Sequence, residues 1–183
     1  MRKRELLKGV FLLGGIVLAF AACNKTDEGP VLDFYITVPS NWNYYVLSNE
    51  NLVYYASSPL ENMNDSILED VLVSKDKATG VELDQFVSAV ITSLNEDTSF
   101  HALQFKADTT INGEACSKLI HLQVVYNPIP STNDSVALNA KVTRYFYVHN
   151  NYGYVVSMNA LVETYPTYKP VFETIISSFS FKN

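Results

Sequence analysis

The sequence is poor in cysteine and in basic residues, and each shortage removes a class of protein. Its 183 residues include two cysteines, and 13 Lys and Arg stand against 19 Asp and Glu. Two cysteines cannot form a disulfide framework, and the acidic excess argues against binding nucleic acid by charge. Internal repeats, low-complexity tracts and Gly/Ser-rich linkers are also missing after Pro30. With 48% hydrophobic and 17% charged residues, the chain is predicted to fold as a single domain over residues 31–183.

The first 22 residues have the three parts of a signal peptide. Four basic residues precede an apolar run from Val10 to Phe20, and two alanines follow it. Even counted from Gly9 to Ala22, this run falls short of the roughly 18–20 residues that a permanent membrane-spanning helix needs. We therefore expect residues 1–22 to be removed. The remaining chain has nine basic and eighteen acidic residues, a net charge of about −9 at neutral pH.

The residues at the expected cleavage point, Phe20-Ala21-Ala22-Cys23, resemble the lipobox of bacterial lipoproteins. In that family the cysteine is acylated and becomes the first residue, so the resemblance implies that Cys23 carries lipid such as palmitate. Phe20 departs from the leucine that the family prefers at the first position. The alternative is an ordinary secretory signal peptide followed by an incidental cysteine. Two or three acyl chains would anchor the protein stably, since each buried methylene contributes about 0.8 kcal/mol.

Residues 23–30 are polar and are predicted to form a flexible tether of about 25 Å at full extension. Within it, Lys25-Thr26-Asp27-Glu28 resembles the export signal of Bacteroidetes surface lipoproteins, although a plain solvated linker is an equal alternative. These features predict a cell-envelope protein, lipid-anchored to the outer membrane on its periplasmic side or at the cell surface. The lipid anchor is its expected membrane contact.

The second cysteine, Cys116, is left as the only thiol if Cys23 is acylated. An intramolecular disulfide is then impossible, so folding must depend on packing. Cys116 lies in an alternating β-type segment, which predicts a buried, inert thiol. A nucleophile is the less favoured alternative, because no His-Asn arrangement surrounds it.

The first half of the domain is predicted to be mainly β-strand. A strand over Val31–Val38 ends at a Pro39-Ser40-Asn41 turn, and a hairpin joins Tyr44–Leu47 to Leu52–Ser57. A fourth strand is expected over Ile67–Ser74. The clearest helix is Glu82–Asn95, whose apolar residues fall on one face and whose N-terminus offers Thr79 as a candidate cap.

The second half predicts two long hairpins and a helix. Asn112-Gly113, which tolerates the positive φ values of a type I′ turn, joins strands over Phe100–Ile111 and Glu114–Tyr126. After a loop over residues 127–135, strands at Ala137–Val148 and Tyr154–Val162 form the second hairpin. A helix is predicted from about Thr167 to Ser178, with Pro170 in its first turn, and Phe179-Ser180-Phe181 adds a short strand.

This order predicts an α+β domain in which an antiparallel sheet is flanked by helices. Several segments together resemble the PsbP-like fold group, which includes PsbP, the DcrB-type lipoproteins and the Ran-binding Mog family. The segments that carry the resemblance are Ile36–Trp42 with its Pro-x-x-Trp ending, Leu83-Asp84-Gln85-Phe86, the Asn112-Gly113 hairpin and Ile175–Phe181. The resemblance implies an α/β/α sandwich with roles in binding or assembly. It implies no shared catalytic site, so no functional residue can be transferred.

Residues that could carry chemistry are scattered along the sequence. His101, His121 and His149 lie on three separate segments without a second ligand close by, which favours structural or surface roles over a metal site. Glu69 and Asp70 are consecutive in a β-type stretch, so their side chains should point to opposite faces. Known catalytic and phosphate-binding motifs are also missing. We therefore expect a protein that is not an enzyme and that needs no metal or cofactor.

Aromatic residues are frequent on the predicted strands and could form a binding surface. Exposed Tyr and Trp rings stack on sugars or peptides, but burial under the helices is the favoured alternative. Asp65-Ser66-Ile67, Asp108-Thr109-Thr110 and Asp134-Ser135-Val136 resemble Bacteroidetes O-glycosylation acceptors, although so short a motif often recurs by chance. The aromatic set comprises Trp42, Tyr44, Tyr45, Tyr54, Tyr55, Tyr126, Tyr145, Tyr147, Tyr152 and Tyr154.

Three functions remain open at this point. The preferred hypothesis is a non-catalytic envelope lipoprotein that binds a protein or a small molecule or assists assembly, without nucleic acid. A carbohydrate-contacting surface module is the second hypothesis, motivated by the tyrosines. The third, and least favoured, is a cryptic enzyme or metal-binding protein assembled from distant strands.

Overall fold

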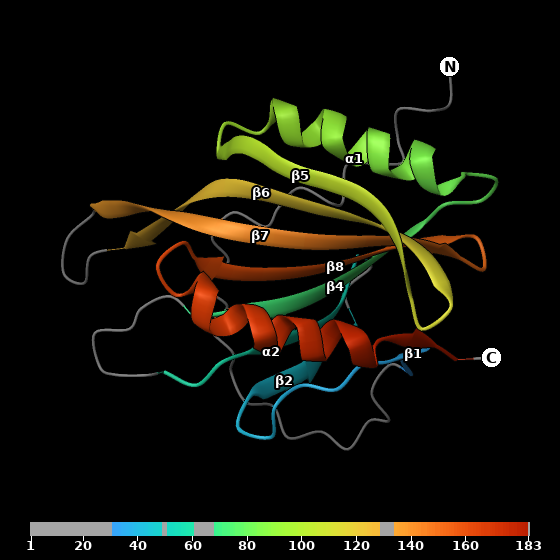
Figure 1. The fold of residues 1–183 in the computed structure, drawn as a ribbon, viewed down its shortest axis with the longest axis horizontal. Coiled ribbons are helices and arrows are strands. Elements are labelled where there is room, and N and C mark those ends of the chain that lie inside the picture. The colour runs from blue at the N-terminus through green and yellow to red at the C-terminus, as the bar shows by residue number, and fades with distance from the viewer. Residues whose placement is uncertain (1–30, 49–50, 61–67, 129–133, 183) are drawn as a thin grey trace.

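The computed structural model describes residues 31–48, 51–60, 68–128 and 134–182 (Figure 1). The strands in this part of the chain are β1 (Phe34–Tyr35), β2 (Asn43–Val46), β3 (Leu52–Ser57), β4 (Asp70–Lys77), β5 (Phe100–Ile111), β6 (Glu114–Pro128), β7 (Ser135–His149), β8 (Tyr152–Leu161) and β9 (Ser180–Phe181). The helices are α1 (Leu83–Glu96) and α2 (Tyr165–Ser178). The predicted α+β class, an antiparallel sheet with two helices, is therefore confirmed.

The main sheet has seven antiparallel strands in the order β2-β3-β4-β8-β7-β6-β5. Both long hairpins predicted from the sequence are present. Asn112 and Gly113 turn between β5 and β6 with φ of 51° and 86°. Asn150 and Asn151 turn between β7 and β8 with φ of 48° and 65°, so two asparagines adopt the left-handed conformation there.

Alternation along the central strands divides the core into two clusters. Tyr145 and Tyr147 of β7 pack with residues of α2, whereas Phe146 between them packs with residues of α1. α1 lies along β5 and also contacts β6 and β7, and α2 lies over β8 (Figure 1). The apolar residues of α1 that the helical spacing predicted to face the core are buried: Phe86, Val87, Val90 and Leu94.

The N-terminal strand is much shorter than predicted. Only Phe34 and Tyr35 pair, and they pair with β9 rather than with the main sheet. The pairing partner of β1 is short, because α2 continues to Ser178 and leaves only Ser180 and Phe181 extended. Beyond this pair, the backbone N–H of Thr37 donates to the hydroxyl of Ser178 instead of to a strand. The alternation itself was correct, since Leu32, Ile36 and Val38 pack against the α2 cluster.

The turn after this segment places the tryptophan in the core. The N–H of Trp42 donates to the carbonyl of Pro39 at 2.9 Å. The indole is buried and lies 6.3 Å from the ring of Tyr168 and 6.4 Å from that of Phe172, both on α2. The Pro-x-x-Trp segment therefore joins β1 and β2 to the helix that covers them.

Three predicted boundaries were wrong. β4 begins at Asp70 and runs to Lys77, three residues beyond the predicted end. The N-cap position of α1 is Glu82 rather than Thr79, and its side chain makes no capping hydrogen bond. The loop predicted over residues 127–135 is shorter, because Pro128 ends β6 and Ser135 begins β7, where the two residues pair.

The start of α2 also differs from the prediction. The helix begins at Tyr165, so Pro166 stands at its N-terminus and Pro170 lies in the second turn rather than the first. Pro166 is tolerated because the first N–H groups of a helix have no partner within the helix. Just before the helix, the hydroxyl of Thr164 donates to the carboxylate of Glu69, the residue that precedes β4, and this contact ties the start of α2 to the sheet. Neither helix of the described residues is long and apolar enough to cross a membrane.

Candidate functional site

The predicted lipid-attachment residue, Cys23, lies outside the described residues, as do the signal peptide, the tether and the Asp65-Ser66-Ile67 motif. Those assignments stay predictions. Of the other two glycosylation motifs, Asp108-Thr109-Thr110 lies on β5 and Asp134-Ser135-Val136 spans the start of β7. The hydroxyl-bearing residues of both motifs are exposed.

Cys116 lies on β6 in the middle of the packed core. Its side chain is fully buried and unpaired with any other cysteine. Burial raises the pKa of its thiol, and a thiol is nucleophilic only as the thiolate. The predicted buried position is confirmed, and the raised pKa disfavours nucleophilic chemistry at this sulfur.

The histidines come from three different strands, of which β5 and β6 are paired with each other. His101 lies on β5 and His121 on β6, whereas His149 ends β7, where its ring stacks on that of Phe181 with centroids 4.0 Å apart. His121 is fully buried, and burial, together with the charge of Arg144, lowers its pKa to about 4. Within the described ranges, no three His, Cys, Asp or Glu side chains come close enough to hold a metal ion.

Glu69 and Asp70 have separate hydrogen-bond partners and do not form an acid–base pair. The buried carboxylate of Glu69 accepts the hydroxyls of Ser58, at 3.0 Å, and of Thr164. Asp70 accepts the side-chain amide of Asn159, and burial raises its pKa to about 7. Both carboxyl groups therefore hold β4 to its neighbours.

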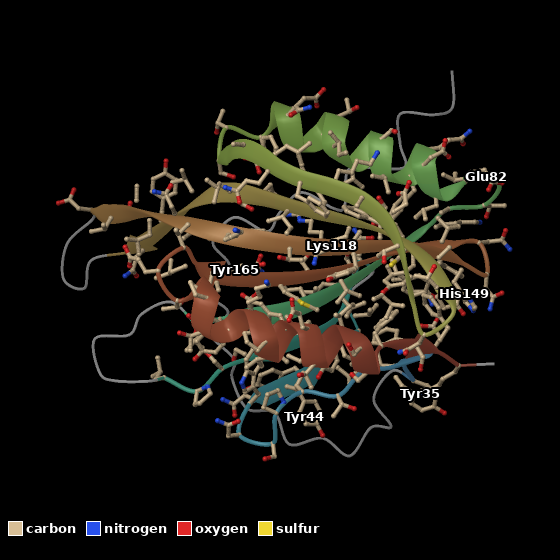
Figure 2. The ribbon with its side chains drawn as sticks, in the orientation of Figure 1. Tyr35, Tyr44, Glu82, Lys118, His149 and Tyr165 are labelled. Atoms are coloured by element: carbon tan, nitrogen blue, oxygen red, sulfur yellow. The ribbon has the colours of Figure 1, made fainter. Side chains whose placement is uncertain are left out.

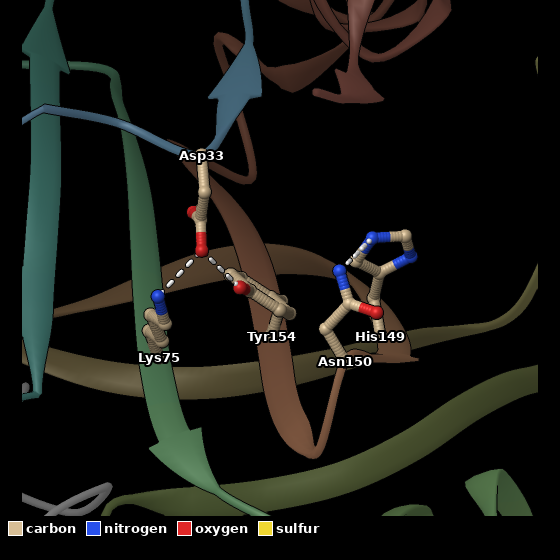
Figure 3. Close-up of polar contacts among 5 residues, drawn as sticks. All are labelled: Asp33, Lys75, His149, Asn150 and Tyr154. Atoms are coloured by element: carbon tan, nitrogen blue, oxygen red, sulfur yellow. Dashed lines mark hydrogen bonds and ion pairs between the residues drawn. The ribbon is translucent and has the colours of Figure 1, made fainter. Parts of the chain in front are cut away.

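Sequence reasoning missed a polar cluster that ties the N-terminal segment to the sheet (Figure 3). The carboxylate of Asp33 accepts the hydroxyl of Tyr154 on β8 at 2.6 Å and the ammonium group of Lys75 on β4. That ammonium group also lies 4.2 Å from the ring centroid of Tyr152. Burial alone would raise the pKa of Asp33, but the hydrogen bonds from Lys75 and Tyr154 hold it below its ordinary value. No local pattern could reveal this cluster, because 42 residues separate Asp33 from Lys75.

The aromatic residues divide into a buried and an exposed set. Buried members are Trp42, Tyr54, Tyr145, Tyr147 and Tyr154, and the exposed ones are Tyr44, Tyr45, Tyr126 and Tyr152, with Tyr55 partly buried. The expectation that the fold covers the rings is therefore correct for about half of the set. Tyr35, outside that set, is also exposed, and the ammonium group of Lys182 lies 4.9 Å from its ring centroid.

The most accessible paired aromatics lie on β2, the terminal strand of the sheet. Tyr44 is 62% exposed and Tyr45 40% exposed, and Figure 2 shows Tyr44 at the periphery of the molecule. Each ring stacks on a tyrosine of β3, Tyr44 on Tyr54 and Tyr45 on Tyr55, with centroids 6.3 Å apart in both pairs. We call Tyr44 and Tyr45 the β2 edge. A terminal strand with supported aromatic rings can pair with an extended peptide or stack on a planar ligand surface.

Several solved structures share this fold at low sequence identity. LpqN from Mycobacterium tuberculosis, described as involved in cell envelope biogenesis, has a TM-score of 0.60 at 12% identity over 86% of this chain and 87% of its own. PA94 from Pseudomonas aeruginosa, described as of unknown function, has a TM-score of 0.58 at 10% identity over 79% and 99%. Cyanobacterial PsbP from Synechocystis sp. PCC 6803 has a TM-score of 0.53 at 11% identity over 88% and 98%.

The chain therefore has a PsbP-like fold, as the resemblance of its segments predicted. At these identities the likeness concerns the fold alone. No protein-family profile matches the sequence, and no curated protein matches it either.

Proposed function

We propose that this chain, with its PsbP-like fold, is a non-catalytic lipoprotein of the cell envelope that binds a partner or assists assembly. Palmitate or a similar acyl group on Cys23 holds it at the outer membrane, and the polar tether of residues 23–30 keeps the domain close to the lipid surface. We infer for it the α/β/α sandwich of the fold group, supported by the packing of α1 on β5, β6 and β7 and of α2 on β8.

The β2 edge is the observation that carries the binding role. Exposed aromatic rings on a terminal strand can contact a partner beside the backbone groups that an extended peptide would pair with. Tyr44 and Tyr45 are adjacent, exposed on opposite faces of a terminal strand, and supported by tyrosines behind them. Rigid aromatic rings of this kind lose little conformational entropy when a partner binds.

The location is supported by sequence and fold together. The leader and Phe20-Ala21-Ala22-Cys23 predict export and acylation, and the structurally similar LpqN is described as involved in cell envelope biogenesis. A net charge of about −9 after processing disfavours nucleic acid as a partner.

Site-specific photo-crosslinking in living cells tests the binding role. A photoreactive residue replaces Tyr44 in the full-length lipoprotein, and a matched variant carries it at Tyr126, which is 63% exposed on β6. We expect a discrete crosslinked product from position 44 and none from position 126. No product from position 44, equal products from both positions, or turnover by the purified lipoprotein on a broad hydrolase panel would each contradict the proposal.

A carbohydrate-contacting module is the second candidate, favoured by the exposed face of Tyr44 on its stacked partner Tyr54. Stacking on a sugar needs the ring but not the hydroxyl. On a glycan array, Tyr44→Phe should keep binding and Tyr44→Ala should lose it. An array without bound glycans removes this candidate.

A further inference from the structure

The outer edge of β5 is the longer of the two unpaired edges of the main sheet. β5 and β2 are the terminal strands of the sheet (Figure 1), and β5 has 12 residues against 4 in β2. β5 pairs with β6 on one side, and no other strand of the described chain pairs with it on the other. A free edge of this length can pair with another extended chain, so proteins usually shorten, bend or cover it.

The second half of β5 is suited to such pairing. Both register shifts between β5 and β6 lie before Phe105, and bulges of this kind protect an edge by bending it. From Phe105 to Ile111 the pairing with β6 is regular, and the segment contains no proline. Phe105 is 47% exposed although it is a large apolar residue, and Lys106, Asp108 and Thr109 are exposed as well. This half of the strand is therefore both regular and accessible.

Alternation along β5 puts two charged residues on one face and Phe105 on the other. Lys106 is opposite Leu119, which packs with α1, so Lys106 and Asp108 face the α1 side. Phe105 and Ala107 face the α2 side. Neither Lys106 nor Asp108 forms an ion pair with any residue that the structure describes. One positive and one negative side chain thus lie two residues apart on the same face.

This charge pattern is complementary to a second copy of itself. Two copies related by a two-fold axis pair as antiparallel strands, and opposite residues must share a face, so the axis passes through a residue. An axis through Ala107 puts Lys106 of each copy opposite Asp108 of the other. An axis through residue 106 or 108 would put like charges opposite each other, which is destabilising. An axis through residue 105 would include a register shift, and one beyond residue 108 would run the pairing towards the turn at Asn112.

We propose that two copies of this chain form a dimer through β5, with the two-fold axis at Ala107 and two Lys106–Asp108 ion pairs across it. The two seven-stranded sheets join into one, and both α1 helices lie on the same side of it. Phe105 of each copy lies opposite Thr109 of the other and diagonal to its Ala107, which removes part of the ring from water.

A second copy fits this edge better than an extended peptide from another protein. An unrelated peptide carries arbitrary charges opposite Lys106 and Asp108, whereas a second copy supplies both complementary charges. The paired segment is short and mostly polar, so the interface is smaller than that of a permanent dimer.

The dimer is therefore weak and forms where copies are concentrated. The lipid anchor would concentrate them at a surface, and in this respect the inference rests on the proposed function. Pairing at β5 leaves the β2 edge free, because the two strands are at opposite ends of the sheet. The dimer and a partner at the β2 edge can therefore be tested separately.

Disulfide trapping in living cells tests the position of the axis. Ala107→Cys in the full-length lipoprotein puts the cysteine on the axis, where opposite Cα atoms are about 4.5–5.5 Å apart, within the range that a disulfide spans. Thr109→Cys, on the same face, is the matched control, because its two copies would lie about 14 Å apart. After oxidation we expect a reducible dimer from Ala107→Cys above the yield of the parent protein, and about tenfold less from Thr109→Cys.

Charge reversal tests the two ion pairs. In the Ala107→Cys background, Lys106→Asp and Asp108→Lys each put like charges opposite each other and should lower the dimer yield about fivefold. The double variant restores two pairs of opposite charge and should recover the yield. When the two single variants are coexpressed with different tags, they should crosslink to each other rather than to themselves. Both positions are exposed, so the melting temperatures should stay close to that of the parent.

Several results would overturn the dimer. They are equal yields from positions 107 and 109, a mixed disulfide with another protein in place of the dimer, single variants that crosslink as well as the parent, and a double variant that does not recover. Fractionation of the same cells separates this inference from the proposed function, because membrane-associated protein without the dimer contradicts the dimer alone. Soluble protein contradicts the anchor, and the purified Ala107→Cys chain must then form the disulfide at high concentration; its absence there also overturns the dimer.

Discussion

At the scale of single residues, most of the buried or half-buried carboxylates hold segments that are distant in sequence. Asp33 joins the N-terminal segment to β4 and β8, Glu69 joins β4 to the start of α2, and Asp70 joins β4 to Asn159 of β8. The contact of Asp33 with Lys75 is a charge-assisted hydrogen bond, which favours the ionised carboxylate, whereas burial favours the neutral form of Asp70. For Asp33 and Asp70, whose folded-state pKa values are shifted, these contacts should therefore appear as pH-dependent stability rather than as catalysis.

Asp33→Asn removes the charge that Lys75 and Tyr154 contact. We expect a loss of about 1 kcal/mol in the free energy of unfolding at pH 7, because the pair is partly exposed. The folded-state pKa of Asp33 is lowered, so its contribution is present above about pH 4 and is lost as the pH falls through the folded pKa. Urea unfolding of wild type and Asp33→Asn at pH 7 and pH 3 measures the loss of stability and its dependence on pH. Tyr154→Phe, which removes only the hydroxyl, should lower the free energy of unfolding by less. If the difference in stability between wild type and Asp33→Asn does not change with pH, Asp33 does not have this role.

His121 predicts the opposite kind of acid sensitivity. Its folded-state pKa of about 4 lies below the value of about 6.5 expected for the unfolded chain. Its contribution is therefore complete above about pH 6.5 and declines as the pH falls towards 4, because the unfolded state binds the proton first.

The stability difference between wild type and His121→Leu should shrink by on the order of 2 kcal/mol between pH 7 and pH 4.5. Chemical denaturation at the two pH values measures this change. Gln123→Leu, two residues along the same strand and also buried, changes a side chain that does not titrate and serves as the control. Equal behaviour of both variants would show that His121 is not the sensitive group.

At the scale of elements, α1 is attached to the sheet through a contact that tolerates no extra atom. A Cβ added at Gly153, next to the turn between β7 and β8, would lie 2.6 Å from atoms of the Phe86 ring. Because Phe86 is buried and its ring lies against Phe146, it has little room to move. We expect Gly153→Ala to cost about 1–3 kcal/mol.

A double-mutant cycle identifies the cause of that loss. Phe86→Leu removes the clashing atoms, so Gly153→Ala should cost less in the Phe86→Leu background than in wild type. Thermal and urea unfolding of the four proteins measure the coupling. Equal costs in both backgrounds would mean that the alanine acts through the backbone instead.

Elements were predictable where the signal is local. The face of α1 follows from helical spacing, and the turn between β5 and β6 follows from the positive φ that Asn112 and Gly113 tolerate. β1 and the start of α2 were misjudged because their limits depend on distant partners, the end of the chain for β1 and Glu69 for α2.

At the scale of the whole molecule, the position of the domain depends on the chain that precedes residue 31. Under the proposed acylation of Cys23, the acyl chains would hold the mature N-terminus in the lipid, and a tether of about 25 Å would limit how far the domain can move away. The β2 edge would then meet only partners near the membrane. A soluble form of the same domain would lose that restriction while keeping its fold.

Cys23→Ala separates these contributions in one experiment. The variant should incorporate no labelled palmitate and should shift from the membrane to the soluble fraction or remain uncleaved, because acylation of the thiol is the expected step before processing. Cys116→Ala is the matched control, since its buried thiol should carry no lipid and its loss should leave fractionation unchanged. Palmitate on Cys23→Ala, or a wild-type protein that is soluble and unlabelled, would show that the domain reaches its partners without a lipid anchor. In that case the crosslink from position 44 should persist when Cys23→Ala is introduced. If wild type is anchored by lipid, Cys23→Ala should abolish both the membrane association and the crosslink.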